Sequence, residues 1–508
     1  MAKMEKERNF GVLLVMGTLL LLIGGATYAY FVAQGGASTN SSVRVQTSTT
    51  DNLSFSVGSS VNLTADQTSF ASGKGNVTGS TTATALLTAN DATNEATEHY
   101  YLYFNITNNP FIYTTSSNSA ELLLTITDPN NKVVTELDGM NYVTSGGVSG
   151  FDITTYTGPI KIADYYEISA SPNKTDNWKV QVTLVNLDSD QTSNAGKSFT
   201  GVLQISKNSQ YTLATSGCTN GSNLATCLTT LSTKYGQAAS IYHHDASLIL
   251  GAEDDSYRYS GANPDNYVCF GSTASPCPAD NLYRIIYVKS GQVKLIKATV
   301  ASSTLLGTDG DYSSSTEYKW NYKANTTINQ GDGSNDWSTS LLNKTNLNKN
   351  FINKIGTTWA GKIATTTWQV GGADRSMAST AGIKNMYSKE MTTNASTTYS
   401  AKIGLMYASD YGFAASPKYW SLPGWKYNGE DIRKGIKENW LYNDGSYEWT
   451  ISRYSDYAFP VFVVYASGFV DSSRASKAYV VRPVFNLVNS VTYESGAGTH
   501  SNPIRIVV

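Results

Sequence analysis

The chain has 508 residues, more than one hydrophobic core usually serves, so two folded domains are expected. Its formal net charge is only -2 and it has no long basic run, so no nucleic-acid partner is expected. Charged residues make up 15% of the chain, whereas about 25% is usual in soluble domains. Thr, Ser and Asn carry most of the polarity, and with 34 Tyr and 9 Trp they are typical of extracellular β proteins.

An uncharged apolar segment, residues 10–33, follows a short charged N-terminus. As a helix it would extend about 36 Å, enough to cross a hydrocarbon core of about 30 Å. We therefore expect residues 1–35 to form a signal or membrane anchor, with the chain beyond them exported. The segment is long for a cleaved signal, yet small residues at Thr27 and Ala29 would permit cleavage, so anchored and secreted forms both stay open.

Four cysteines fall as two close pairs, Cys218 with Cys227 and Cys269 with Cys277. Zinc sites need tight CxxC or His-Cys groupings, which this sequence lacks. Two local disulfides are therefore predicted, each worth about 2–3 kcal/mol by loop closure. Four free thiols are the alternative, which an exported protein disfavours because its surroundings are oxidising.

Residues 36–206 are expected to form an antiparallel β-sandwich. Polar and apolar residues alternate in several runs, and Trp178, Val180 and Val182 share one face of the run that ends at Leu184. Such period-two alternation between clusters of Asn, Asp, Gly and Pro predicts half-buried antiparallel strands.

Residues 207–240 are expected to be a linker that contains one short helix. Leu224, Leu228 and Leu231 recur at helical spacing, and Gly236 should end the helix.

A second domain is expected over residues 241–508. It mixes short helices, one of which should end at Gly356, with strands that include a hairpin around Ser290 and Gly291. This pattern predicts an α+β fold with many loops.

The first part of the chain, about 10–206, resembles the TasA/camelysin family. The residues that carry this are GGATYAYF at 24–31 and YFNITNN at 103–109. The family comprises Firmicutes surface and biofilm-matrix proteins with a jelly-roll β-sandwich. The resemblance therefore implies a jelly-roll-like sandwich here. Some members form fibres by donating an N-terminal strand, which would require residues 36–60 to be extended and unpaired in the monomer; a stalk would fold them into its own sheet.

The second part resembles an uncharacterised module of surface proteins from gut Firmicutes. It carries YRYSGANPDNYV at 257–268, KIGLMYASDYG at 402–412 and VRPV at 481–484. The module is similar in layout to C-type-lectin-like folds, which implies a binding surface on the loops before the last core strand. The formylglycine-generating type of this fold needs cysteines near its C-terminus; here the last is Cys277, so that activity is not expected.

No catalytic or zinc constellation stands out. There is no G-x-S-x-G elbow, and the neighbours His243, His244 and Asp245 cannot all point at one ion from a strand. Calcium is the one metal with candidate ligands, in the Asp- and Gly-rich segments 307–311 and 331–336. Neither completes an EF-hand loop, and Asp-Gly pairs also form ordinary turns. A pair of carboxylates for glycoside hydrolysis stays open, because such residues are neighbours only in space.

Aromatic residues crowd the segment 418–465. Aromatic faces stack on sugar rings and anchor protein interfaces at low entropy cost, although the same rings can simply fill a core. Neighbouring Pro, Gly, Lys, Asp and Ser favour exposure of five of them, and Arg453 adds a hydrogen-bonding cation. The predicted ligand-binding residues are Trp420, Trp425, Tyr427, Arg453, Tyr454 and Tyr457.

These patterns predict a mainly β surface adhesin that binds a glycan or a surface protein without chemistry. It would be held in the membrane through residues 10–33, or secreted if the leader is cleaved. A self-assembling matrix-fibre subunit is the first alternative and an extracellular hydrolase the second. If its rings are exposed, changing Trp420 and Trp425 together to Ala should abolish ligand retention with little change in melting temperature.

Overall fold

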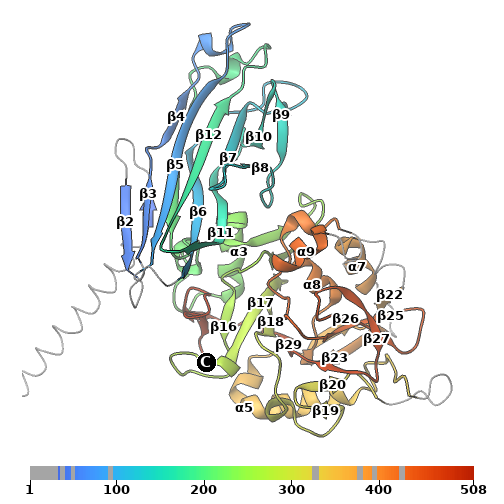
Figure 1. Cartoon of the computed structure of the whole chain (residues 1–508). Helices are drawn as coiled ribbons and strands as arrows, with labels where there is room; N and C mark the ends of the chain where they lie inside the picture. The colour runs from blue at the N-terminus through green and yellow to red at the C-terminus, as the bar shows by residue number, and fades with distance from the viewer. Residues whose placement is uncertain are drawn as a thin grey trace, which may run out of the picture. The chain divides into compact units, whose positions relative to one another are not determined.

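The structure is a computed structural model that divides into two compact units, Met1–Gln210 and Tyr211–Val508 (Figure 1). Both units are mainly β, with sheets in which antiparallel pairs dominate. The residues that the structure describes are 32–34, 41–46, 52–89, 95–322, 331–374, 382–391, 397–422 and 430–508.

Most of the predicted membrane segment, residues 10–31, lies outside the described residues. Its last two residues, Val32 and Ala33, do not continue a helix as predicted, because their backbone pairs in strand β1 (Val32–Gln34) with Ser206 and Ile205. Among the described residues, no helix combines the length and the apolar character needed to cross a membrane.

The first unit is a sandwich of two antiparallel sheets. Its strands are β1, β2 (Ser41–Gln46), β3 (Asn52–Val57), β4 (Val61–Thr64), β5 (Val77–Thr88), β6 (Ala96–Asn108), β7 (Leu122–Thr127), β8 (Val133–Val134), β9 (Tyr142–Ser145), β10 (Val148–Asp152), β11 (Gly158–Ala170), β12 (Asn173–Leu184) and β13 (Ser198–Ser206), with 3-10 helices η1 (Gln67–Phe70) and η2 (Thr192–Asn194). One sheet has the order β1-β13-β6-β11, with β4 also on β13; the other runs β2-β3-β5-β12-β7-β10-β9, with β8 on β7.

One hydrophobic core fills the space between these sheets. Phe104 and Leu203 reach it from the first sheet, and Leu87 and Val180 from the second. The alternation predicted for β12 is confirmed, because its apolar residues are buried while Lys179 is exposed. Apolar residues on alternate positions therefore fix which face of each strand points inward.

Strands β2 and β3 are paired within this sandwich. Val43 lies opposite Phe55 in the β2–β3 pair, and Phe55 lies opposite Ala85 in the β3–β5 pair. This is the arrangement expected of a stalk, and it differs from the unpaired segment that strand donation would require.

A buried carboxylate joins the loops at one end of the sandwich. Glu121 is 0% exposed. Its Oε1 accepts hydrogen bonds from the backbone N and Oγ1 of Thr114, both at 2.6 Å. Its Oε2 accepts from Nε2 of Gln191 at 2.9 Å and Nδ2 of Asn194 at 2.7 Å. Four donors therefore offset the cost of burying this side chain.

Replacing Glu121 with Ala should lower the free energy of unfolding by about 3 kcal/mol, because it takes the acceptor from the buried amides of Gln191 and Asn194 and from two half-buried donors of Thr114. Differential scanning calorimetry of the whole chain would show the loss as a lower melting temperature. The exposed Glu136 provides the control, for which Ala should change stability by less than about 0.5 kcal/mol. Equal melting temperatures for both variants would contradict this role.

The second unit contains many short elements. Up to residue 320 these are α2 (Leu213–Ser216), α3 (Leu224–Tyr235), η3 (Gly236–Ala239), β14 (Ile241–His244), β15 (Ser256–Tyr259), β16 (Tyr267–Cys269), η4 (Ala279–Asn281), β17 (Leu282–Lys289), β18 (Gln292–Lys297), α4 (Ser303–Leu306), β19 (Tyr312–Ser314) and β20 (Glu317–Lys319). The later ones are η5 (Leu342–Phe351), α5 (Ile352–Gly361), β21 (Thr366–Gln369), β22 (Gly372–Ala373), α7 (Ile383–Glu390), β23 (Thr398–Ala401), β24 (Ile403–Gly404), α8 (Ala408–Phe413), η7 (Pro417–Tyr419), α9 (Glu430–Lys437), β25 (Glu448–Tyr454), β26 (Pro460–Val464), β27 (Val470–Arg474), β28 (Ala478–Val480), β29 (Val484–Asn486), β30 (Tyr493–Ser495) and β31 (Ile504–Ile506).

Two sheets organise these elements. The first has the order β24-β29-β18-β17-β16-β31-β30, with β15 on β17 and β14 on β15. The second has the order β19-β20-β28-β25-β26-β27, with β22 on β25, and β21 pairs separately with β23. The predicted β17–β18 hairpin is confirmed, since Ser290 and Gly291 form its turn with φ values of 50° and 74°.

The segment predicted as a linker belongs largely to the second unit, which begins at Tyr211. Helix α3 ends at Gly236 as predicted. Its Leu224 and Leu228 are 0% exposed in the core of the unit, however, so the helix is part of the fold. Helix α3 packs into the unit because its apolar face is buried in this core.

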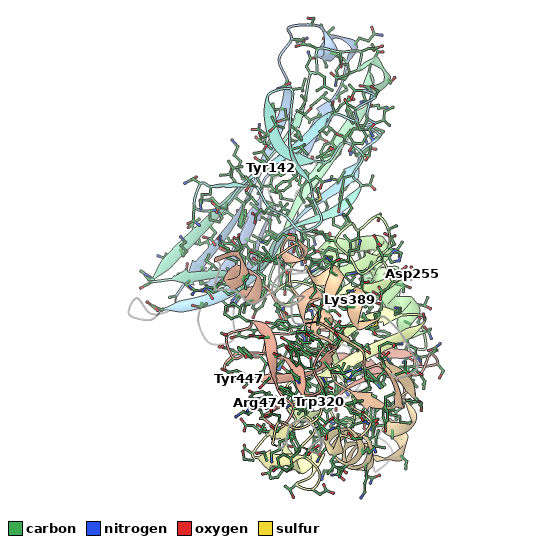
Figure 2. The ribbon with its side chains drawn as sticks, turned by 90° about the vertical axis from the view of Figure 1, so that its right-hand side faces the viewer. Tyr142, Asp255, Trp320, Lys389, Tyr447 and Arg474 are labelled. Atoms are coloured by element: carbon green, nitrogen blue, oxygen red, sulfur yellow. A yellow bond between two sulfur atoms is a disulfide. The ribbon has the colours of Figure 1, made fainter. Side chains whose placement is uncertain are left out.

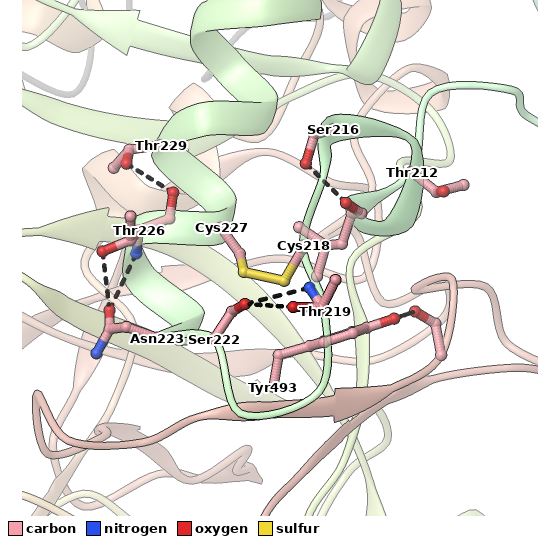
Figure 3. The surroundings of a disulfide bond; sticks show 12 residues. Thr212, Ser216, Cys218, Thr219, Ser222, Asn223, Thr226, Cys227, Thr229 and Tyr493 are labelled. Carbon is pink, nitrogen blue, oxygen red and sulfur yellow. Dashed lines mark hydrogen bonds between the residues drawn. A yellow bond between two sulfur atoms is a disulfide. The ribbon is translucent and has the colours of Figure 1, made fainter.

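Both predicted disulfides are confirmed, Cys218–Cys227 and Cys269–Cys277. Figure 3 shows the first, which closes a loop between α2 and α3. The loop pairs with the C-terminal segment: Gly221 N donates to Tyr493 O, and Tyr493 N donates to Ser222 O, each at 2.8 Å.

In the second unit, a buried cluster of charges connects the sheet that contains β15 and β18 to helices α7 and α8. The Arg258 guanidinium contacts Asp410 Oδ1 at 3.1 Å and Asp254 Oδ2 at 3.0 Å. Lys294 Nζ contacts Asp410 Oδ2 at 2.6 Å, and the Tyr387 hydroxyl donates to Asp254 Oδ2 at 2.6 Å. Burial alone would raise the pKa of Asp254, but Arg258 and the hydrogen bonds hold it well below its usual value.

Candidate ligand-binding cleft

A polar cleft of about 640 Å³ opens beside the loop between β25 and β26. Residues 334–338 form one wall, Arg453 and residues 455–458 form the other, and Val370 also lines the cleft. Two of the predicted ligand-binding residues lie in this cleft: Arg453, near the end of β25, and Tyr457, in the β25–β26 loop.

The buried amide of Asn335 holds the two walls together. Its Nδ2 donates to the carbonyl oxygens of Tyr454, Tyr457 and Pro460 at 3.1, 2.7 and 3.1 Å. Its backbone N donates to Ala458 O at 2.8 Å. A single side chain thus fixes the course of an otherwise exposed loop, which keeps the cleft preformed.

Arg453 extends from β25 into the cleft lining. Its Nε donates to Val370 O at 2.8 Å, which orients the guanidinium. Burial lowers the pKa of Arg453, although the nearby Asp336 carboxylate opposes this. Among the described residues, its two terminal nitrogens have no acceptor within hydrogen-bond distance, so they are available to a ligand.

Acceptors line the same cleft. Asp336 is exposed, and its Oδ1 receives hydrogen bonds from Ser338 N at 2.9 Å and Ser338 Oγ at 2.6 Å. Asp456 is exposed on the opposite wall. The cleft therefore holds one cation and two carboxylates, a balance that disfavours an anionic ligand.

Two aromatic residues complete the lining. Tyr457 is 50% exposed. Trp337 is 1% exposed and packs against Trp320 with 4.7 Å between ring centroids. Its Nε1 has no acceptor among the described residues. A buried indole N–H without an acceptor costs free energy.

The prediction that Tyr454 and Trp420 are exposed is wrong. Tyr454 is 3% exposed and packs against Phe462. Trp420 is 1% exposed. Its Nε1 donates to Ala415 O at 2.9 Å, which turns the ring inward against His244 and Phe413. The other two predicted residues, Trp425 and Tyr427, lie outside the described residues.

Most carboxylates of the two calcium candidates are engaged in local structure. Asp311 Oδ2 accepts from the backbone N of Leu341 and Leu342 at 3.0 and 3.1 Å, at the start of η5. Asp332 forms an ion pair with Arg474 at 3.0 Å. In the part of the chain that the structure describes, no three His, Cys, Asp or Glu side chains gather as metal ligands.

Sequence reasoning missed Asn335, Trp337 and Asp456 as members of a site. Asn335 and Asp336 lie in a segment predicted as a turn or a calcium site, and in a motif that carries the resemblance to the C-type-lectin-like module. Their one distinguishing feature was the run Asn335-Asp336-Trp337-Ser338, and nothing in the sequence placed it opposite residues 453–458.

A buried acid lies behind Arg453. The neighbouring Ser452 donates through Oγ to Glu390 Oε1, which also accepts from Ser409 N at 3.3 Å. Oε2 of Glu390 has no partner among the described residues. Burial raises the pKa of Glu390 to about 7, against the lowering effect of Ser409 and Ser452.

The second unit should therefore lose stability as the pH rises. A carboxyl group whose pKa is higher in the folded state contributes fully below its unfolded value, about 4.5, and the contribution is lost as the pH passes 7. Replacing Glu390 with Gln removes this titration, so the fall in melting temperature between pH 5 and pH 8 should be smaller. The exposed Glu494, changed to Gln, is the control. An identical pH dependence in wild type and E390Q would refute the assignment.

Trp420→Ala should lower the free energy of unfolding by about 3–5 kcal/mol, because it empties a large buried volume. Tyr457→Ala should change it by less than about 0.5 kcal/mol, since the ring is half exposed. Thermal unfolding of the two variants compares them directly. A melting temperature for Trp420→Ala equal to that of wild type would restore the original prediction of an exposed ring.

Protein-family models, curated proteins and solved structures were each compared with the chain, and none matches it. Its function is therefore inferred from the contacts, burial and charge of its own residues.

Proposed function

We propose that this protein is a cell-surface recognition protein that binds a neutral glycan in the cleft without chemical change. The observation that carries the proposal is the meeting of an exposed ring, Tyr457, with hydrogen-bond donors and acceptors on walls fixed by Asn335. Sites of this kind are concave, largely preformed and supplied with a few polar groups that set orientation.

The chemistry of a sugar matches this lining. Sugar hydroxyls both donate and accept, so they can bond to the carboxylates of Asp336 and Asp456 and to the guanidinium of Arg453. The apolar face of a sugar ring can stack on Tyr457. An acidic sugar would meet two carboxylates for one cation, which favours a neutral glycan over it.

A surface location is proposed on separate grounds. The apolar residues before strand β1, 10–31, would anchor the chain or direct its secretion, and both disulfides suit an oxidising exterior. The sandwich would then serve as a stalk. The pairing of β2 and β3 within their own sheet supports a stalk over a fibre subunit that donates this segment.

Binding can be tested by applying the purified chain to a glycan array. Wild type should retain at least one neutral glycan, and Tyr457→Ala and Arg453→Gln should each weaken its binding by about tenfold, the loss of about 1.4 kcal/mol. Tyr165→Ala, an exposed tyrosine of the first unit, is the matched control and should bind normally.

The array also separates this proposal from its rivals. Retention of no glycan by a folded wild-type chain would refute it and favour a protein ligand or a fibre role. Bound oligosaccharides should be recovered intact; shortened products would instead show that Asp336 and Asp456 act as a hydrolytic pair.

A further inference from the structure

Three tyrosines lie at the strand ends opposite the β25–β26 loop: Tyr447 precedes β25, Tyr465 follows β26, and Tyr479 is in β28. We call them the tyrosine platform. Ring centroids of Tyr447 lie 4.9 Å from Tyr465 and 5.2 Å from Tyr479. Tyr447, labelled in Figure 2, is 42% exposed, and the other two are half-buried. Tyr465 and Tyr479 pack partly against the core of the unit, whereas Tyr447 leaves a large part of its ring open to a ligand.

The outer rings of the platform are held rigidly. The Tyr465 hydroxyl donates to Ser472 O at 3.3 Å, and the Tyr479 hydroxyl is 2.9 Å from Ser473 Oγ. Tyr447 contacts both of these rings, and no hydrogen bond of its hydroxyl is found among the described residues. Aromatic rings fixed in advance lose little entropy when they bind a ligand.

Strand β27 connects the platform to the cleft. Near its start, Tyr465 N donates to Phe469 O at 2.7 Å. Beyond its end, Ala475 N donates to Phe459 O at 3.0 Å, while Arg474 pairs with Asp332, which precedes the cleft wall. The five residues of β27 span about 17 Å at about 3.3 Å per residue, more than a single sugar ring can bridge.

The surface between the two sites is polar. Ser472 and Ser473 are half-buried, and Arg474 and Lys477 are exposed, so hydroxyl and cationic groups follow the strand and the turn after it. Such groups can hydrogen-bond to the hydroxyls of a chain lying across them.

We infer that the ligand is an extended neutral oligosaccharide, whose one end occupies the cleft at Tyr457 while a later ring stacks on Tyr447 of the tyrosine platform. This inference rests on the glycan-binding function proposed above and narrows it. It predicts that affinity depends on chain length and that the two tyrosines act on different parts of the ligand.

The test uses isothermal titration of the whole protein with neutral oligosaccharides of one to six rings, built from glucose, galactose, mannose or N-acetylglucosamine. For a sugar type that binds, affinity should rise about tenfold or more between the shortest and longest chains. Tyr447→Ala should cancel most of that rise and leave the shortest chains unaffected. Tyr457→Ala should weaken short and long chains by the same factor.

Tyr447→Phe keeps the ring and should retain the affinity for long chains, which separates stacking from loss of fold. Short chains that bind as tightly as long ones, or a Tyr447→Ala variant that binds long chains normally, would overturn the inference and leave the glycan site in place. Binding of no sugar in the panel would refute the proposed function, and the inference with it.

Discussion

The second unit depends on the burial of Arg258 between Asp254 and Asp410. Elements as short as β15 and α8 bury little apolar surface each, so cross-links between them add substantially to the stability of the unit. The cluster supplies them by joining β15 and β18 to α7 and α8 through ion pairs and one tyrosine hydroxyl. Losing one partner would leave the other charge buried and unpaired, which is strongly destabilising.

Within this frame, side-chain amides shape the loops. Asn335 holds the β25–β26 loop by three carbonyl contacts, and in the first unit Asn109 contacts three carbonyls of residues 153–156 in the same way. Loops fixed by a few buried polar contacts can present exposed side chains in defined positions. The shape of the cleft thus depends on the hydrogen bonds of a buried amide in its lining, Asn335.

Elements with a regular apolar pattern were predictable from the sequence, whereas contacts between distant segments were not. Alternation at Trp178 and Val180 identified β12, and Ser290-Gly291 identified the β17–β18 turn. The prediction that Trp420 is exposed was wrong because it relied on the polar neighbours of this residue in the sequence. In the structure a hydrogen bond to Ala415 turns its ring inward. Two residues of the cleft lining, Arg453 and Tyr457, were among the predicted ligand-binding residues. The facing wall around Trp337 depends on tertiary pairing that no local pattern encodes.

The disulfide-closed loop at residues 218–227 has a mechanical consequence. A pull arriving along the chain from Tyr211 reaches Cys218 before helix α3, and the covalent bond passes it directly to Cys227. Residues 219–226 are thereby shielded from tension, and with them the hydrogen bonds of Gly221 and Ser222 to Tyr493. When the second unit is pulled from its N-terminal end, residues 219–226 should therefore stay joined to strand β30 near its C-terminal end.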